Sequence, residues 1–345
     1  MKKVALFLCG LLFLVFSFLF FPYLTVPKFV EDNRKPFQGN RFYNPYQELD
    51  SLWYIANFHA HSNSWGWLTD GRKNHIDSIY KMYKELGYTI INISNYHKIT
   101  LKDSMAMPSY EHGVNIFKRH QLCLGASKVR WIDFFFWQKL KHKQHIINKL
   151  KETSEFVAIC HPAFSGSFEP KDFSSLYHYD AIEVFNHYRT SVAHWDSALS
   201  SGYYAVLLAN DDVHNISKMD ETGVCFTVVN NDIDFSKPLI EQLKKGVHYG
   251  VRVEKHPNES LEVKKMRIAH IVHPKKIEIT HNLLNVELEK PVREIRFIGQ
   301  GGNIKCSVSD TNQATYPFVP EDTYIRIEVF DWEGNFYIFN PVIKK

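Results

Sequence analysis

The region from residue 53 to residue 94 alternates a short apolar run, an amphipathic segment and a second apolar run. The first run, WYIANF, covers residues 53–58, and the second, YTIINIS, covers residues 88–94. Apolar side chains recur at helical spacing over residues 75–86, and Gly87 stands where a helix would end. A strand–helix–strand unit predicts a parallel sheet, because parallel neighbours need a long crossover connection.

The same signals continue along the chain and then change. Further strands are predicted for FVAIC (156–160), AIEVF (181–185) and YAVLLA (204–209), and an amphipathic helix for residues 138–152. After about residue 275, strand-like runs follow one another without helical segments: KIEITHN, NVELEK, EIRFIG, YIRIEVFD and FYIF, with a turn at EGN. An antiparallel β domain is therefore expected at the C-terminus.

The N-terminus predicts a membrane segment or a secretion signal. Lys2 and Lys3 precede an uncharged run of 18 residues, from Val4 to Phe21, which can span a bilayer. The run lacks a small-x-small cleavage site, which favours an uncleaved anchor, although a cleaved signal stays open. The two lysines would remain in the cytoplasm, so the rest would be exported to the cell envelope, anchored or secreted.

We therefore expect four regions: a signal anchor (1–25), a linker (26–50), an α/β part (51–255) and an antiparallel β domain (270–345).

The net charge of +4 is small for 345 residues and no basic block occurs, so a nucleic-acid partner is not expected. The cysteines form no CxxC pair; they either form disulfides outside the cytoplasm or serve as small apolar residues in strands.

Ligand-type side chains follow the apolar runs one after another. These residues are His59, His61, His97, His161, Asp212 and His214. In a parallel α/β barrel the carboxyl ends of the strands meet on one face, where the active site lies. The pair in NFHAHS is apt for a metal, because side chains two residues apart on an extended chain point the same way. Imidazole and carboxylate groups bind Zn²⁺, Mn²⁺ or Fe²⁺.

Several ordered motifs resemble those of the PHP (polymerase and histidinol phosphatase) superfamily. They are HAHS, TDGRKN, YTIINISNYH, the HP at 161–162, IEVFN and DDVH, and they cover roughly residues 52–250. The resemblance implies a distorted (β/α)7 barrel with up to three metals and phosphatase or phosphodiesterase activity. A metal-bound hydroxide would attack the phosphorus of a small phosphorylated substrate.

The resemblance also implies which side chains would bind the metals. His59 and His61 would hold a first metal together with Asp212. Asp70 and His214 would hold another, and His142 and His161 would lie at the second site. Helix-borne His142 has a plainer alternative as a surface residue, as do His120, His187 and His194 as ordinary surface or core histidines.

Three departures from the family pattern predict a reduced site of one or two metals. Where the family has TDH, this chain has Ser94-Asn95-Tyr96-His97, so either Tyr96 replaces the histidine or His97 supplies it. The stretch that matches the family's bridging glutamate, Leu124 to Lys128, contains no acid. Lys128 is then either a solvated side chain or a replacement for part of a missing metal's charge. The third departure is a long gap before Asp70.

Other polar residues and other functions stay open. Glu183, Asn186 and Asp211 are expected to orient ligand side chains or to contact substrate. One rival function is that of a metal amidohydrolase, which also begins with HxH on a strand. Another is a non-catalytic metal-binding protein of the cell envelope. The oligomeric state is not predicted.

Overall fold

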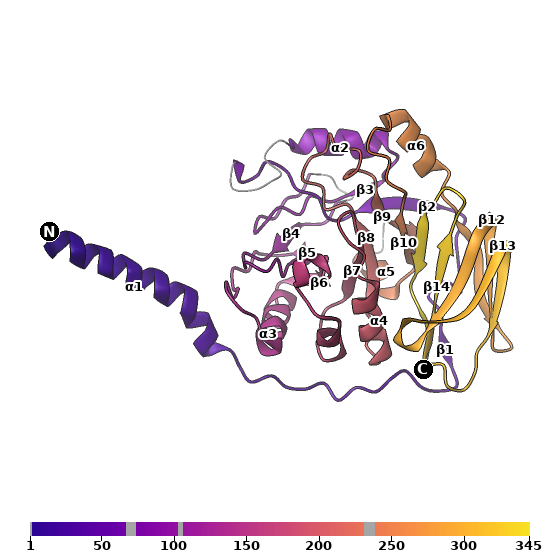
Figure 1. Cartoon of the computed structure of the whole chain (residues 1–345), viewed down its shortest axis with the longest axis horizontal. Coiled ribbons are helices and arrows are strands. Elements are labelled where there is room, and N and C mark those ends of the chain that lie inside the picture. The colour runs from indigo at the N-terminus through magenta and orange to yellow at the C-terminus, as the bar shows by residue number, and fades with distance from the viewer. Residues whose placement is uncertain (1, 67–73, 103–105, 231–238) are drawn as a thin grey trace.

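The computed structural model describes residues 2–66, 74–102, 106–230 and 239–345, which form two β-sheets flanked by helices (Figure 1). The N-terminal helix α1, Lys2–Thr25, extends away from this body. It is long and apolar enough to cross a membrane, and a signal sequence near an N-terminus has the same character. Near the end of α1, the Tyr23 hydroxyl accepts the backbone N–H groups of Phe136 and Trp137, at 2.9 and 3.1 Å.

The smaller sheet has five strands in the order β4-β5-β6-β7-β8. They are β4 (Ser109–His112), β5 (Gln121–Ala126), β6 (Ser154–Ile159), β7 (Ala181–Asn186) and β8 (Val206–Asn210). The strands β6, β7 and β8 are parallel, and β7 and β8 are buried along their whole length, as expected for strands covered on both faces. In contrast, β5 runs antiparallel to both of its neighbours.

The larger sheet joins the N-terminal part of the chain to its C-terminal strands. Along its main path the order is β1-β16-β14-β15-β10-β9-β2-β3. The strands are β1 (Phe42–Tyr43), β2 (Trp53–Asn57), β3 (Ile90–Ile91), β9 (Cys225–Asn230), β10 (His248–Arg252), β14 (Tyr324–Phe330), β15 (Phe336–Phe339) and β16 (Val342–Lys344). Three long strands, β11 (Pro274–Thr280), β12 (Leu283–Gly299) and β13 (Asn303–Pro317), pair antiparallel beside them. The pairing of β10 with β15 makes this sheet continuous.

The helices lie around the two sheets (Figure 1). They are α2 (Ile76–Glu85), α3 (Leu140–Lys151), α4 (Val192–Ser200), α5 (Leu239–Lys245) and α6 (Leu261–Ala269), with short 3-10 turns η3 (Phe164–Gly166), η4 (Pro170–Ser174) and η5 (Gln300–Gly302). The helix α2 forms where the sequence predicts it, because Ile79, Tyr80 and Tyr83 make one buried face. It ends before Gly87, whose φ of 91° suits glycine.

The predicted (β/α)7 barrel is wrong. The described residues form two sheets, and no closed barrel is found among them. Two features work against closure: β5 is reversed relative to β6, and β9 pairs antiparallel with both β2 and β10. The sheets meet through isolated bridges, Ala60 with Val213 and Tyr96 with Glu111. The antiparallel C-terminal strands are present, whereas the division into four regions stays a prediction.

Candidate metal centre

The two histidines of NFHAHS lie just beyond β2, against the segment that follows β8. The backbone N–H of His61 donates to the carbonyl of Val213 at 3.0 Å, and that of Asp212 donates to the carbonyl of His59 at 2.9 Å. This short stretch of parallel pairing brings Asp212 to the histidine pair. The two Nε2 atoms are 3.2 Å apart, and the Asp212 Oδ1 atom lies 3.2 Å from His59 Nε2 and 3.1 Å from His61 Nε2.

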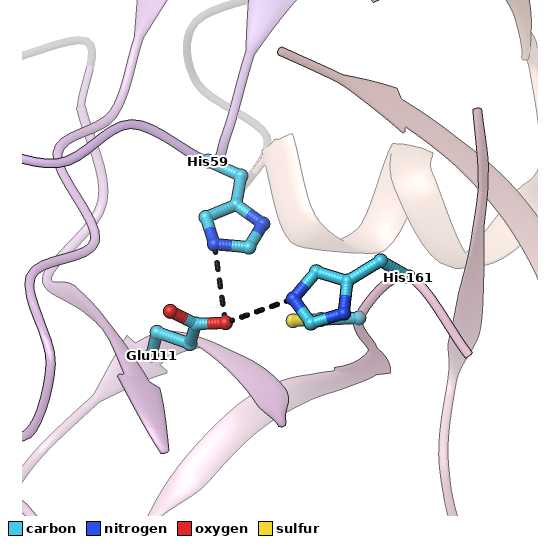
Figure 2. A group of neighbouring side chains, drawn as sticks. His59, Glu111 and His161 are labelled. Carbon is cyan, nitrogen blue, oxygen red and sulfur yellow. Dashed lines mark hydrogen bonds and ion pairs between the residues drawn. The ribbon is translucent and has the colours of Figure 1, made fainter. Parts of the chain in front are cut away.

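The centre of the cluster is Glu111, a buried side chain near the end of β4. Its Oε1 atom lies 3.4 Å from His59 Nε2 and 3.3 Å from His161 Nε2, and Figure 2 shows the carboxylate between these two rings. The same oxygen lies 2.8 Å from Nδ1 of His120, which directly precedes β5. Its Oε2 atom lies 3.1 Å from His61 Nε2. One carboxylate thus faces four imidazoles.

These side chains fall into two overlapping groups whose ligand atoms lie within 4.8 Å of one another. One group is His59, His61, Glu111 and Asp212, and the other is His59, Glu111, Cys160 and His161. All of these residues are buried, and Glu111 Oε2 and Asp212 Oδ1 face only imidazole nitrogens, which donate a hydrogen bond only when they are protonated. A buried carboxylate oxygen without a donor is costly unless a cation neutralises it. The cluster therefore fits a metal ion, although the structure shows no ion's identity.

Two members of the cluster have strained backbones. His161 has a φ of 27° and Asp212 a φ of 52°, in the region that residues with a Cβ atom seldom adopt. Such conformations cost about 1–3 kcal/mol each and persist where the surrounding structure imposes them, often at functional sites. Here the unusual φ values occur in the residues that follow β6 and β8, next to the shared carboxylate.

Burial and opposite charges act against each other on the pKa values of the cluster. Burial by itself would raise the pKa of Glu111, but His120 and His59 outweigh it and hold the pKa well below its ordinary value. Burial by itself would lower the pKa of His59, but Asp212 and Glu111 outweigh it and raise that pKa well above its ordinary value. The carboxylates thus stay charged and raise the pKa values of His59, His61 and His161, whereas burial outweighs Glu111 at His120 and lowers its pKa. A cation entering the cluster would displace protons from the imidazoles.

Glu183, on β7, forms hydrogen bonds with two residues of the cluster, His59 and His161. Its Oε1 atom accepts the Nδ1–H of His59 at 3.0 Å, and its Oε2 atom accepts the backbone N–H of His161 at 2.9 Å. The Asn186 amide donates to Glu183 Oε2 and to Asp212 Oδ2. Once a metal ion displaces the other proton, His59 would keep its proton on Nδ1 and present the lone pair of Nε2 to the cluster, which is the usual arrangement of a metal-binding histidine. Glu183 and Asn186 therefore contact ligand-type side chains of the cluster by hydrogen bonds.

His214 and Tyr96 lie beside the cluster on the solvent side. The His214 Nδ1 atom is 2.9 Å from the backbone oxygen of Asp212, and its ring stacks on His61 with centroids 4.4 Å apart. The Tyr96 ring also stacks on His61, at 4.5 Å. A cavity of about 120 Å³ is lined by both rings together with His120, His161 and Asp212. Small molecules can therefore reach the cluster.

Several predicted ligands lie elsewhere. His97 has both ring nitrogens at backbone groups: its Nε2 accepts the N–H of Gly113 at 3.0 Å, and its Nδ1 lies 3.2 Å from the oxygen of Arg130. His142 accepts the backbone N–H of Lys139 at the start of α3, and its ring packs against Phe134. Neither belongs to a ligand group among the described residues. Asp70 lies outside the described residues.

Two other predicted residues, Lys128 and Asp211, are not members of the two ligand groups. Lys128 is exposed in the turn after β5. His120 is at the other end of that strand, and the six residues of β5 span about 20 Å. The Asp211 carboxylate accepts the backbone N–H groups of Gly223, Val224 and Cys225 and the Tyr83 hydroxyl, so it shapes the chain entering β9.

Glu111, His120 and Cys160 are cluster residues that the sequence does not predict as ligands. The family pattern places the bridging glutamate at Leu124 to Lys128, whereas the site carboxylate is Glu111, in the polar stretch SYEH. The useful signal is the apolar run QLCLGA, which His120 precedes. In an antiparallel strand, the residue before the run reaches the edge where the parallel strands end, so His120 at the start of β5 meets residues at the ends of β6 and β8.

Comparisons with protein-family models, with curated proteins and with solved structures find no match to this chain. The geometry of the buried cluster is therefore the main guide to what the protein does. What it establishes is a buried group of histidine, glutamate, aspartate and cysteine side chains that could hold a metal ion.

Proposed function

We propose that this chain is a metal-dependent hydrolase of phosphoesters, a phosphatase or a phosphodiesterase. The observation that carries the proposal is the overlap of two ligand groups at Glu111, whose two carboxylate oxygens face different imidazoles. A carboxylate in that position can bridge neighbouring ions, an arrangement that suits displacement at phosphorus. The order of HAHS, HP and DDVH, which resembles that of the PHP superfamily, supports the same function.

One or two divalent ions would bind. His59, His61, Glu111 and Asp212 would hold the first, and Glu111, Cys160 and His161 would contribute to the second. Nitrogen and oxygen donors with one thiol suit Zn²⁺, Mn²⁺ or Fe²⁺. Such an ion supplies Lewis acidity, which lowers the pKa of water and neutralises charge on the phosphoryl oxygens.

The chain's own residues would position the substrate and the ligands. Glu183 keeps the His59 ring in the tautomer that faces the cluster. The Lys118 side chain lines the cavity above the cluster, where an ammonium group would attract an anionic phosphoryl group. Phe164 and Tyr188 line the same cavity with aromatic rings.

For the location of the protein, we propose that α1 is kept as an anchor and that the rest is exported. The contacts of Tyr23 with the backbone of Phe136 and Trp137 support retention, because cleavage after the helix would remove them. The exposed Trp137 ring beside Tyr23 suits the membrane–water interface, where aromatic side chains gather. N-terminal sequencing of the protein from isolated membranes tests this; a chain that begins after Thr25 would contradict it.

The proposed activity is tested on the full chain purified in detergent. Metal content is measured together with hydrolysis of p-nitrophenyl phosphate and bis-p-nitrophenyl phosphate, with added Mn²⁺, Zn²⁺ or Fe²⁺. We expect metal-dependent turnover that falls about 100-fold or more in Glu111→Gln, which keeps the side-chain shape but removes the shared charge. The control is Glu152→Gln, an exposed residue at the end of α3, which should behave as the unchanged protein.

The outcomes separate the rival functions. Bound metal without turnover of either ester would contradict a phosphoesterase and favour an amide substrate or a binding role. No bound metal in the unchanged protein would contradict the metal centre itself. Equal activity in Glu111→Gln and Glu152→Gln would mean that the turnover does not depend on the cluster.

A further inference from the structure

A second cavity adjoins the one above the cluster. Its volume is about 360 Å³, within the range of small-molecule sites, and Trp65, Val114 and Trp131 contribute to its walls. Tyr96, Lys118 and His120 line both cavities. The two spaces are thus neighbours along one path from the ligand groups to the protein surface.

The two tryptophans of this second cavity are held in place although they are exposed. The Trp65 indole N–H donates to the backbone oxygen of Tyr96 at 2.6 Å. One face of Trp131 stacks on His97, with ring centroids 4.6 Å apart and planes 18° apart, while 62% of the residue stays exposed. Exposed tryptophan is costly in water, so two fixed indoles beside a reactive cluster indicate a surface for a ligand ring.

The charge around the path complements the apolar walls. No salt bridge engages the Lys118 ammonium within the described part of the chain, and this side chain stands between the cluster and the tryptophans. A ligand that fits would carry its anionic group towards the cluster and Lys118, and a flat apolar group towards Trp65 and Trp131. A phosphate ester of a ring-bearing alcohol has this shape and charge.

We propose that the cavity of Trp65 and Trp131 is the subsite for the alcohol part of the substrate, and that this part is a six-membered ring with an apolar face. An aromatic ring presents its flat face to indole, and a pyranose chair presents a face of C–H groups. This inference rests on the proposed phosphoesterase function. It also assigns a role to His97: its ring supports Trp131 and so shapes the subsite.

The test compares Trp131→Ala with Trp332→Ala. The two tryptophans are 62% and 64% exposed, and Trp332 lies in the turn between β14 and β15, so it is a matched control for loss of an exposed indole. The value of kcat/KM is measured for phenyl phosphate, glucose 1-phosphate and glycerol 3-phosphate. We expect Trp131→Ala to lose about tenfold on a ring ester and nothing on glycerol 3-phosphate, with Trp332→Ala unchanged on all three.

The ester that suffers the loss identifies the ring. A loss confined to phenyl phosphate assigns an aromatic ring, and a loss confined to glucose 1-phosphate assigns a pyranose. An equal loss on all three esters, or none on either ring ester, would overturn the subsite while leaving the hydrolase in place.

Binding without turnover separates this inference from the proposed function. Intrinsic fluorescence is followed during titration with phenylphosphonate, glucose 1-phosphate and the ringless methylphosphonate. If no ester is hydrolysed but a ring ligand changes the fluorescence in the unchanged protein and in Trp332→Ala, and not in Trp131→Ala, the subsite stands and the hydrolase fails. If neither ring ligand binds more tightly than methylphosphonate, the subsite is wrong.

Discussion

Within the described residues, the buried charged groups around Arg326 and around Glu111 differ in how their charges are satisfied. Arg326, on β14, donates to both oxygens of Asp196 at 2.7 and 2.8 Å and to Glu328 at 2.6 Å. At the metal centre, Glu111 and Asp212 each have one buried oxygen that faces only imidazole nitrogens. In the first group the cation is the Arg326 guanidinium, whereas the second group could hold a metal ion from solution. The difference lies in the partners: a guanidinium of the chain faces the carboxylates of the first group, whereas imidazoles face those of the second.

The largest effect is expected at Arg326. Arg326→Met should lower the free energy of unfolding by about 3–5 kcal/mol, because it leaves two buried carboxylates without a cation. The control Arg296→Met removes a partly exposed pair with Glu294 and should cost about 0–1 kcal/mol. Urea denaturation of both variants measures this. Similar losses in the two would mean that the buried network is no stronger than a surface pair.

Metal should stabilise the protein by a comparable amount. At an ion concentration 100 times the Kd, the free energy of unfolding should rise by about 2.7 kcal/mol. Asp212→Asn removes a ligand and its charge, so we expect it to abolish this rise. Asp310→Asn, an exposed change on β13, should keep the full rise. Thermal unfolding with and without Zn²⁺ measures the rise in stability. A rise that persists in Asp212→Asn would mean that the ion binds elsewhere.

Glu183 acts on the metal through His59. Glu183→Gln keeps a hydrogen bond but loses the charge behind the ligand ring, so the metal affinity should fall about 10–100-fold. Competition with a coloured chelator measures the affinity, and Glu152→Gln is again the exposed control. An unchanged affinity in Glu183→Gln would show that the orientation of His59 does not depend on this carboxylate.

The smallest effect concerns His248, a buried histidine outside both groups. Burial lowers its pKa to about 4, while its Nε2–H donates to the carbonyl of Leu207. The unfolded chain therefore binds a proton at His248 that the folded chain refuses, so stability falls as pH drops from about 6.5 towards 4. At pH 5.5 this costs about 1.4 kcal/mol relative to pH 8.

Denaturation at several pH values checks this. In His248→Gln, the free energy of unfolding should fall less between pH 8 and pH 5.5 than it does in the unchanged protein. His256→Gln, an exposed histidine, should leave the fall as it is. An identical slope in His248→Gln would assign the acid sensitivity to other groups.

Sequence alone predicted most of the separate elements and part of the site. β6, β7 and β8 lie close to the predicted strands, because buried β-branched runs are strong local signals. His59, His61, His161 and Asp212 meet because each follows a strand. The barrel prediction failed because strand direction depends on distant pairing: nothing in QLCLGA indicates that β5 is reversed. That reversal also hid Glu111 and His120, which come from the hairpin rather than from a βα crossover.

The segment from Glu111 to His120 has a consequence for how this protein can change. It is a single hairpin connection whose two ends supply cluster residues, and its middle supplies Gly113, Val114, Asn115 and Lys118 to the second cavity. β4 and β5 hold the two ends of this connection. One connection therefore supplies two residues of the cluster and part of the wall of the second cavity. A change of its length would alter that wall, whereas Glu111 would keep its place on β4.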